Sequence, residues 1–499
     1  MCIISSLHKK AGRAACGRPG RLPNAALRNS QYDKGVAPRG ACITMTKDLT
    51  KGSPVRLILG FAIPLLAGML FQQLYSFVDT MIVGRFLGVT ALAGVGATGS
   101  INFLVLGFCM GICSGFAIPV AQRFGAHEES RMREFVSNGA WLSMAFATVI
   151  TVLTVVYCRD ILTLMNTPED CFEEAYRYIV VIFAGIPCTF LYNLLSGYLR
   201  SLGDSKTPLF FLILSSVLNV ALDLLFILVF RLGVLGASMA TVISQGVSGL
   251  LCLLWIAMKF PILHITREEW RVRSRRMAEL CAYGVPMGLQ YSITAIGSVI
   301  LQVAVNSLGS VAVAAATAGG KVLGFLACPF DALGSTMATY GAQNVGASRY
   351  DRLNSGLFAA SMMGFAYSVV AFAVTWFFGS NLVSLFVSGA GGAELIELSK
   401  QYMIVVVLFY PLLTLVNVVR FMIQGMGFSA FAIIAGVMEM IARSLAGIVL
   451  VPVWGFIGAA LGGPLAWVFA DIFLIPAYFR CRRHLMSTAH HMNVAPAQR

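Results

Sequence analysis

Charge is scarce in this sequence. Asp, Glu, Lys and Arg make up 12% of the 499 residues, against about 25% in a typical soluble domain, and hydrophobic residues make up 58%. The mean hydropathy is +0.80, and apolar runs of about 20 or more residues recur, each long enough to span a bilayer. The composition therefore excludes an ordinary soluble domain and predicts a helical protein with many membrane spans.

Acidic residues are fewer than basic ones, which gives a formal net charge of +14. The basic residues lie in short segments between apolar runs, and this pattern is typical of cytoplasmic loops rather than of a nucleic-acid-binding face. We therefore expect a lipid bilayer as the surroundings and no nucleic-acid partner.

Motifs for metal, nucleotide and redox chemistry are missing. The sequence has no CxxC pair among its 12 Cys, no HExxH and no GxxxxGK[ST] phosphate loop. None of the six His lies in a predicted span, and Cys inside apolar segments behaves as a small hydrophobic side chain. We therefore predict neither an enzyme nor an ATP-driven motor, and we expect no cofactor.

Residues 1–44 differ from the rest of the chain. They are basic and contain no long apolar run, so they lack the hydrophobic core of a secretory signal. Two interpretations stay open: a disordered basic arm, or an extension upstream of a natural start at Met45, which we favour.

Twelve apolar segments follow, six on each side of a polar linker. In the first half they cover residues 58–83, 91–117, 136–157, 175–199, 208–230 and 234–258. In the second half they cover residues 278–305, 311–338, 355–378, 401–424, 428–452 and 454–479. We therefore predict an N-lobe (45–258), a linker (259–277), a C-lobe (278–479) and a cytoplasmic tail (480–499).

The segments between spans alternate in charge. Those after the second, fourth, sixth and eighth spans are rich in arginine, for example Arg123, Arg200 and Arg271, whereas the opposite side carries acids such as Asp160 and Glu173. Because basic loops stay in the cytoplasm, we predict that both termini are cytoplasmic. The predicted location is the plasma or inner membrane of the cell.

The two halves resemble each other at one shift of about 221 residues. Pro64 opens the first span as Pro286 opens the seventh, and the Ala-Gln pair at Gln122 recurs at Gln343. Six spans separate the copies, so both copies run the same way through the membrane. The sequence thus predicts an all-α integral membrane protein, with twelve transmembrane helices in two six-helix lobes related by a parallel internal repeat. Secondary transporters built this way enclose a central cavity and work by alternating access.

Polar residues inside the N-lobe spans suggest an ion site. Asp79 lies deep in the first span, and Asn219 and Asp223 share one face of the fifth at i, i+4 spacing. Asn193 and Thr241 add neutral oxygens. Two carboxylates in a low-dielectric setting cannot both stay ionised unless a cation lies between them, so this set suits a shared proton or Na⁺. The alternative is a set of separate interhelical hydrogen bonds.

The C-lobe departs from this pattern. Glu439 and Arg443 stand where the repeat would place Asn219 and Asp223. Oppositely charged side chains at i, i+4 neutralise each other, so a structural salt bridge and a substrate contact both stay open. Gln290 and Lys321 are the other candidate polar or substrate contacts of this lobe.

Several short motifs resemble those of one transporter family. They are Pro64, Gln73, Asp79 and Gly84 in the first span, Ala121-Gln122-x-x-Gly125-Ala126, Arg200-Ser-x-Gly203-Asp204-x-x-x-Pro208, Asn219-x-x-x-Asp223, and Gly341-Ala-Gln343-Asn344-x-Gly346. Over residues 57–479 the chain resembles the multidrug and toxic compound extrusion (MATE) transporters, particularly the bacterial branch.

The resemblance implies two lobes in a V shape, with H⁺ or Na⁺ entering as organic cations or drugs leave. It also implies a coupling-ion site in the first lobe, at the positions Asp79, Asn193, Asn219, Asp223 and Thr241. A site in the second lobe is disfavoured, because residues 284–309, which form most of the seventh span, contain no acid.

Three functional hypotheses follow. The leading one is a monomeric antiporter, coupled to H⁺ or Na⁺, that exports amphipathic and often cationic drugs or metabolites. The alternative is a lipid-linked oligosaccharide flippase of the same superfamily, disfavoured because only Arg420, Arg443 and Lys321 are candidate cavity cations. A membrane enzyme or a channel fits least, because nucleophile motifs are missing and a lobe repeat is typical of transporters.

Overall fold

The structure is a computed structural model, and it describes residues 47–165, 167–384 and 392–494. The predicted N-terminal extension, residues 1–44, lies outside the described residues. Everything below concerns the unit that begins at Met45.

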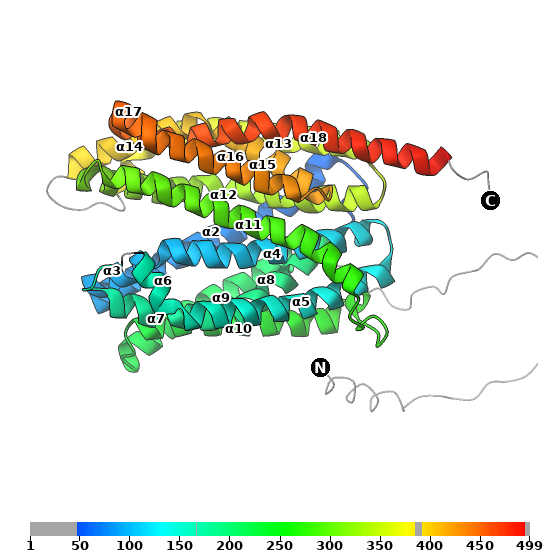
Figure 1. Cartoon of the computed structure of the whole chain (residues 1–499), viewed down its shortest axis with the longest axis horizontal. Helices are drawn as coiled ribbons and strands as arrows, with labels where there is room; N and C mark the ends of the chain where they lie inside the picture. The colour runs from blue at the N-terminus through cyan, green and yellow to red at the C-terminus, as the bar shows by residue number, and fades with distance from the viewer. Residues whose placement is uncertain (1–46, 166, 385–391, 495–499) are drawn as a thin grey trace, which may run out of the picture. The chain divides into compact units, whose positions relative to one another are not determined.

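All regular structure in the described residues is helical (Figure 1). The first half contains α2 (Pro54–Leu87), α3 (Val89–Ala97), α4 (Gly99–Gly125), α5 (Glu129–Val156), α6 (Cys158–Leu164), α7 (Phe172–Ala184), α8 (Ile186–Ser201), α9 (Lys206–Leu224), the π-turn η1 (Leu225–Val229) and α10 (Val234–Lys259). After the short η2 (Pro261–Leu263), the second half contains α11 (Ser274–Asn306), α12 (Ser310–Gly346), α13 (Asp351–Ser384), α14 (Gly392–Leu408), α15 (Tyr410–Gly425), α16 (Ala430–Leu445), the π-turn η3 (Ala446–Leu450), α17 (Val451–Ala460) and α18 (Gly462–Val494).

These helices account for the twelve predicted spans. Within the described residues ten helices are long and apolar enough to cross a membrane, and two bent pairs bring the number to twelve. The pairs are α7 with α8, bent by 47°, and α14 with α15, bent by 50°. Pro187 and Pro411 lie in the first turn of α8 and α15, where the missing N–H costs no helical hydrogen bond. The predicted all-helical fold with twelve spans is confirmed.

The internal repeat is visible in the backbone as well as in the sequence. Gly88 and Gly309 both adopt a positive φ, of 88° and 94°, where a first span turns into a second. Gly233 and Gly455 do the same at 61° and 56°, after the π-turns η1 and η3. A side chain would be strained at such angles, so both copies need glycine at the same turn.

The C-terminal helix is longer than the sequence suggested. α18 continues to Val494, well past the predicted end of the last span at residue 479. No Gly or Pro occurs between Arg480 and Val494 to end the helix. The first part of the predicted tail is therefore helical.

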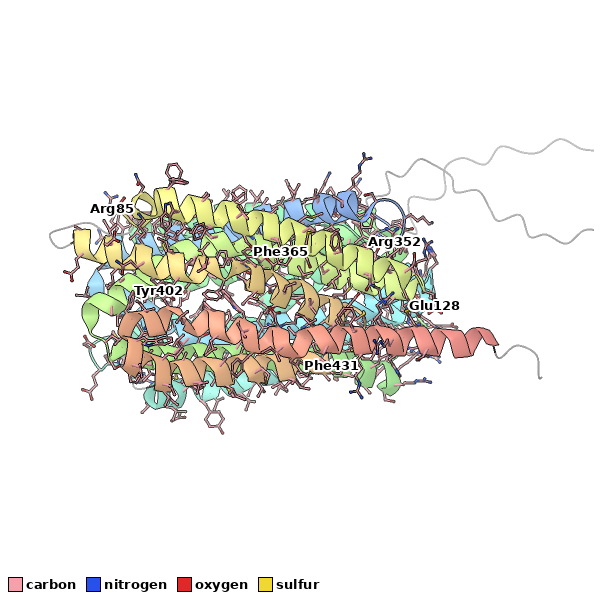
Figure 2. All side chains as sticks on the ribbon, turned by 90° about the horizontal axis from the view of Figure 1, so that it is seen from above. Arg85, Glu128, Arg352, Phe365, Tyr402 and Phe431 are labelled. Atoms are coloured by element: carbon pink, nitrogen blue, oxygen red, sulfur yellow. The ribbon has the colours of Figure 1, made fainter. Side chains whose placement is uncertain are left out.

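In Figure 1 the helices run side by side, with α5, α8, α9 and α10 in one layer and α13, α15, α16 and α18 in the other. We keep the name N-lobe for α2–α10 and C-lobe for α11–α18. Figure 2 shows Glu128 and Arg352 at the same end of the unit and Arg85 at the other. The end with Glu128 and Arg352 also holds the linker, and we call it the linker end. The division into separate domains at the linker stays a prediction.

The lobes meet along α4 and α11, where glycines of the two helices face each other. Gly111 and Gly115 of α4 face Gly288 and Gly284 of α11, and each pair has GxxxG spacing. A Cβ added at Gly111 would lie 2.6 Å from the Cα of Gly288. Small residues at this spacing let two helix backbones touch inside a membrane, so this line of glycines sets how closely the lobes approach.

The linker folds back onto α5 through Glu269, whose side chain is buried. The carboxylate of Glu269 accepts hydrogen bonds from Thr266 N at 2.8 Å and from Ser130 Oγ and Arg133 Nε at 3.0 Å. Burial alone would raise the pKa of Glu269, but these hydrogen bonds outweigh it and hold the pKa below the ordinary value of 4.5. The linker is thereby fixed to the N-lobe.

Candidate functional site

A cavity of about 220 Å³ lies inside the N-lobe. Four predicted site residues line it: Asp79 from α2, Asn193 from α8, Asn219 from α9 and Thr241 from α10. Asp223 lies one turn beyond Asn219 on α9 and is fully buried. The structure thus brings together the five residues that the sequence singled out in this lobe.

The two acids form a direct pair. The carboxyl groups of Asp79 and Asp223 face each other within hydrogen-bonding range. Two ionised carboxylates have no proton to share, and the described residues supply no donor to Asp79 Oδ1 or to either oxygen of Asp223. Buried acceptors without donors are rare in proteins. The pair is therefore incomplete without a proton or a cation.

Two amide oxygens that line the same cavity also lack hydrogen-bond donors. Asn219 Oδ1 and Asn102 Oδ1 are buried and accept no hydrogen bond from the described residues. Asn219 donates its amide to Thr241 Oγ1 at 3.4 Å, which leaves its oxygen directed elsewhere. Asn193 donates to the Thr189 carbonyl at 2.8 Å. Oxygen atoms of this kind are the ligands that hard cations prefer.

Sequence reasoning missed several polar side chains of this cavity, among them Asn102, Tyr178 and Gln245. Gln245 Oε1 accepts a hydrogen bond from Thr189 Oγ1 at 2.7 Å. Asn102 was the easiest of the three to predict from the sequence, because it is an amide within an otherwise apolar run. No sequence signal distinguished Tyr178 from an interfacial tyrosine. The described residues contain no group of three or more His, Cys, Asp or Glu suited to a metal ion.

The C-lobe polar residues lie away from this cavity. Glu439 forms a buried ion pair with Arg420 and lies 3.5 Å from Arg443 Nη2. Arg443 also donates to the Thr294 carbonyl at 3.1 Å. The predicted Glu439–Arg443 neighbours are thus in contact, but Glu439 has a closer partner in Arg420, which the sequence left without one. Its role as salt bridge or substrate contact stays a prediction.

The two remaining C-lobe candidates differ in environment. Gln290 of α11 is buried, and its Oε1 accepts a hydrogen bond from Gln424 Nε2 at 2.7 Å. Lys321 of α12 is exposed. Neither residue lines the N-lobe cavity or the cavity described next.

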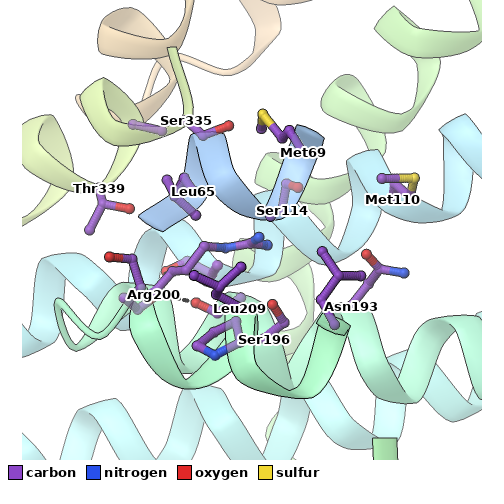
Figure 3. Close-up of a pocket in the computed structure, with 18 of the residues that line it drawn as sticks. Leu65, Met69, Met110, Ser114, Asn193, Ser196, Arg200, Leu209, Ser335 and Thr339 are labelled. Atoms are coloured by element: carbon purple, nitrogen blue, oxygen red, sulfur yellow. Dashed lines mark hydrogen bonds between the residues drawn. The ribbon is translucent and has the colours of Figure 1, made fainter. Parts of the chain in front are cut away.

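A second cavity, of about 190 Å³, lies between the lobes (Figure 3). Residues of α2, α4, α8 and α9 line it on one side, and residues of α11, α12 and α15 on the other. It adjoins the N-lobe cavity, because Gln72, Met110, Tyr192, Asn193 and Leu212 line both. Asp79 therefore lines a cavity that neighbours the inter-lobe cavity.

Arg200 lines this second cavity, and the sequence prediction did not include it among the site residues. The charge pattern assigned Arg200 to a basic connecting segment, but it lies in the last turn of α8 and lines the inter-lobe cavity. Figure 3 shows its side chain extending into the pocket. α8 ends at Ser201, two residues after the predicted end of the fourth span at residue 199. α8 begins only after the 47° bend.

The linker end of the inter-lobe cavity is closed by two equivalent contacts. Gln122 Nε2 of the N-lobe donates to the Gly425 carbonyl of the C-lobe at 3.1 Å. Gln343 Nε2 of the C-lobe donates to the Ser201 carbonyl of the N-lobe at 2.8 Å. Gln343 Oε1 also accepts from Leu49 N at 2.9 Å, so the residues preceding α2 join the closure.

Glycines make this closure tight. A Cβ at Gly125 would collide with the Gln343 carbonyl, and a Cβ at Gly346 would collide with the Gln122 carbonyl. The Ala-Gln-x-x-Gly-Ala motif found twice in the sequence is therefore an inter-lobe contact made in both directions. Its spacing puts the glutamine and the glycine on neighbouring turns of one helix end.

Comparisons with known proteins agree with this architecture. A family model described as MatE matches residues 64–225 and 286–453. The "Probable multidrug resistance protein YoeA" of Bacillus subtilis (strain 168) is 30% identical over 351 residues, which cover 69% of this chain and 76% of that protein. The "Probable multidrug resistance protein YpnP" of the same organism is 28% identical over 387 residues, or 76% of this chain and 83% of that protein.

A solved structure shares the fold. It is described as the "Outward-facing conformation of a multidrug resistance MATE family transporter of the MOP superfamily", and it superposes with a TM-score of 0.82 at 21% identity. The match covers 88% of this chain and 98% of that one. With two-thirds of the chain matched by the family model, the protein is a multi-pass membrane transporter of small molecules and belongs to the MatE family, the multidrug and toxic compound extrusion transporters.

Proposed function

We propose that this transporter is an antiporter that exports amphipathic small molecules, often cationic drugs or metabolites, in exchange for H⁺ or Na⁺ bound at Asp79 and Asp223. The observation that carries this proposal is the buried acid pair, whose oxygens have no donors among the described residues. Carboxylates inside a membrane are costly and mark ion pathways by default. A proton or Na⁺ removes the repulsion between the two acids.

Helix α2 couples the ion to the substrate. It carries Asp79 into the N-lobe cavity, while its residues Leu65 and Met69 line the inter-lobe cavity. Ion binding draws Asp79 toward Asp223 on α9, and α2 then shifts or bends near Pro64, which interrupts its hydrogen-bond ladder. The inter-lobe cavity changes shape with α2, which favours release of the substrate.

The charge pattern supports an orientation of the chain in the membrane. The linker end carries most of the arginines, so we assign it, with both termini, to the cytoplasm of a cell with this protein in its plasma or inner membrane. The hydrogen bonds of Gln122 and Gln343 then close the cavity on the cytoplasmic side. This conformation is the one from which a substrate leaves the cell. One chain supplies both lobes and the acid pair, which supports a monomer.

The flippase alternative receives less support. Of its three candidate cavity cations, Arg420 and Arg443 both contact Glu439, and Lys321 lines neither cavity. A pyrophosphate lipid would require several free cations, as phosphate groups are recognised by clustered Arg and Lys.

The test is efflux of a fluorescent amphipathic cation from proteoliposomes that contain the purified protein, with a pH gradient and a Na⁺ gradient imposed in separate experiments. We expect one gradient to drive efflux and the other to have no effect. Equal efflux with no gradient would contradict ion coupling. Efflux that matches protein-free liposomes under both gradients would contradict export of this class of compound.

A further inference from the structure

Arg200 is a cation without a partner at the wall of the inter-lobe cavity. Among the described residues no carboxylate lies within ion-pair distance of it, and no side chain or carbonyl accepts a hydrogen bond from its guanidinium. Its nitrogens are also absent from the set of buried, unpaired atoms, so they remain accessible from the cavity. A guanidinium held in a membrane protein without a counter-charge is costly.

The nearest acid along the chain, Asp204, forms no ion pair with Arg200, and its Oδ2 is buried without a hydrogen-bond donor among the described residues. Asp204 Oδ1 accepts hydrogen bonds from Lys206 N at 3.0 Å and Thr207 N at 3.1 Å, and so caps the first turn of α9. No Asp or Glu lines the inter-lobe cavity. An anionic group bound in the cavity would supply the counter-charge that the described lining residues do not give Arg200.

The rest of the wall suits the same kind of occupant. The hydroxyls of Ser114, Ser335 and Thr339 line the cavity, make no hydrogen bond within the described residues, and are free to donate. Apolar side chains, among them Met69 and Phe421, cover other parts of the wall. Methionine and aromatic side chains adapt to ligands of different shape.

We propose that the inter-lobe cavity binds amphipathic compounds that carry a carboxylate or phosphate group, with this anionic group on Arg200 and the apolar body against Met69 and Phe421. Arginine forms a bidentate, charge-assisted pair with such groups, which a lysine or a neutral side chain does not reproduce. The inference rests on the proposed function, because it takes this cavity as the transport path. It extends the expected substrates from cations to anions and zwitterions.

The test compares two probes that differ in one charge, a rhodamine with a free carboxylate and its methyl ester. Binding to the purified full-length protein is measured by fluorescence anisotropy. We expect the carboxylate to bind more tightly than the ester. We expect Arg200→Gln to weaken carboxylate binding by about tenfold or more, since a hydrogen bond between charged groups is lost, and to leave ester binding unchanged.

Lys206→Gln is the matched control. Lys206 follows Arg200 by six residues, is exposed and does not line the cavity, so its loss removes one positive charge at the same helix junction. We expect binding of both probes to be unchanged in this variant. Arg200→Lys retains the positive charge but loses the planar guanidinium that forms two parallel hydrogen bonds. Its affinity for the carboxylate probe should therefore lie between those of the wild-type protein and Arg200→Gln.

Three outcomes would overturn the inference: equal affinity of the wild-type protein for the two probes, equal weakening of both by Arg200→Gln, or the same loss in Lys206→Gln. The wild-type comparison needs no variant, so it stands even if Arg200→Gln fails to fold. Efflux assays separate the two proposals. Gradient-driven export of the ester without any carboxylate preference refutes only the anion site, whereas carboxylate binding without gradient-driven export refutes only the antiport.

Discussion

Gln122 and Gln343 occupy equivalent positions in the two lobes, and each donates a hydrogen bond to a carbonyl of the opposite lobe. Gln122 reaches the Gly425 carbonyl at the end of α15, and Gln343 reaches the Ser201 carbonyl at the end of α8. Because of the internal repeat, the same kind of contact occurs twice, once from each lobe to the other. Opening of the linker end requires both contacts to break.

Replacement of both glutamines should therefore favour opening of the linker end. Each hydrogen bond contributes about 1 kcal/mol net, so Gln122→Ala with Gln343→Ala should shift the equilibrium by about 2 kcal/mol, or roughly 30-fold. Spin labels at Glu129 and Asp351, whose side chains are 61% and 70% exposed, report the distance between the lobes by pulsed electron resonance. We expect a second population at longer distance.

A matched control for this pair is Gln401→Ala. Gln401 is exposed on α14 and contacts only Glu397, one turn earlier on its own helix. We expect the distance distribution of this variant to equal that of the wild-type protein. An unchanged distribution in the double variant would mean that the glutamines do not hold the lobes together.

The glycine contact between α4 and α11 predicts opposite effects for two Gly→Ala substitutions. Gly111→Ala would place a methyl group 2.6 Å from the backbone of Gly288, and overpacking of this kind costs about 1–3 kcal/mol. Gly320→Ala on α12 would meet no atom within 4 Å, and alanine is favoured over glycine in a helix by up to about 1 kcal/mol. Thermal unfolding in detergent should show a lower midpoint for the first variant and an equal or higher midpoint for the second. A Gly111→Ala protein as stable as the wild type would refute the close contact.

The sequence predicted the fold and the proximity of the N-lobe polar residues for identifiable reasons. Apolar runs and the repeat at Gln122 and Gln343 determined the spans and their order, because membrane burial leaves few alternatives to helices. The i, i+4 spacing of Asn219 and Asp223 placed both on one face of α9, and Asp79 was the remaining acid within the N-lobe spans.

The sequence could not supply the contacts that depend on helix bends and on inter-lobe packing. Arg200 directly follows the predicted fourth span, and the sequence does not show that this side chain lines an inter-lobe cavity. Arg420 had no predicted partner, since Glu439 lies on another helix at an unknown rotation. Asn102 was missed because a single amide in an apolar run does not show which way it points.

Neutralisation of one acid should abolish transport without loss of the fold. In Asp79→Asn the amide cannot exchange a proton and repels no carboxylate, so gradient-driven efflux should fall to the level of protein-free liposomes. The thermal midpoint should stay the same or rise, because the unfavourable contact with Asp223 is removed. Asp160→Asn, at an exposed acid on α6 outside both cavities, is the control and should keep wild-type efflux. Retained gradient-driven efflux in Asp79→Asn would exclude this residue from coupling.

The linker contact of Glu269 predicts a pH-dependent contribution to stability. The pKa of Glu269 is lowered in the folded protein, so its contribution is complete above the ordinary value of 4.5 and is lost as pH falls below that value toward the folded pKa. Glu269→Gln should lower the thermal midpoint by about 2 °C at pH 7. The difference from wild type should shrink below pH 4.5.

Glu268→Gln separates this effect from a general change in charge. Glu268 is the preceding residue, exposed and without a hydrogen bond or ion pair from its side chain among the described residues. Its loss changes the net charge by the same amount, but it should leave the midpoint unaltered at both pH values. A Glu269→Gln deficit that stays constant from pH 7 to below 4.5 would show that the variant acts through lost packing, because a contribution from the ionised carboxylate must disappear once the wild-type side chain is protonated.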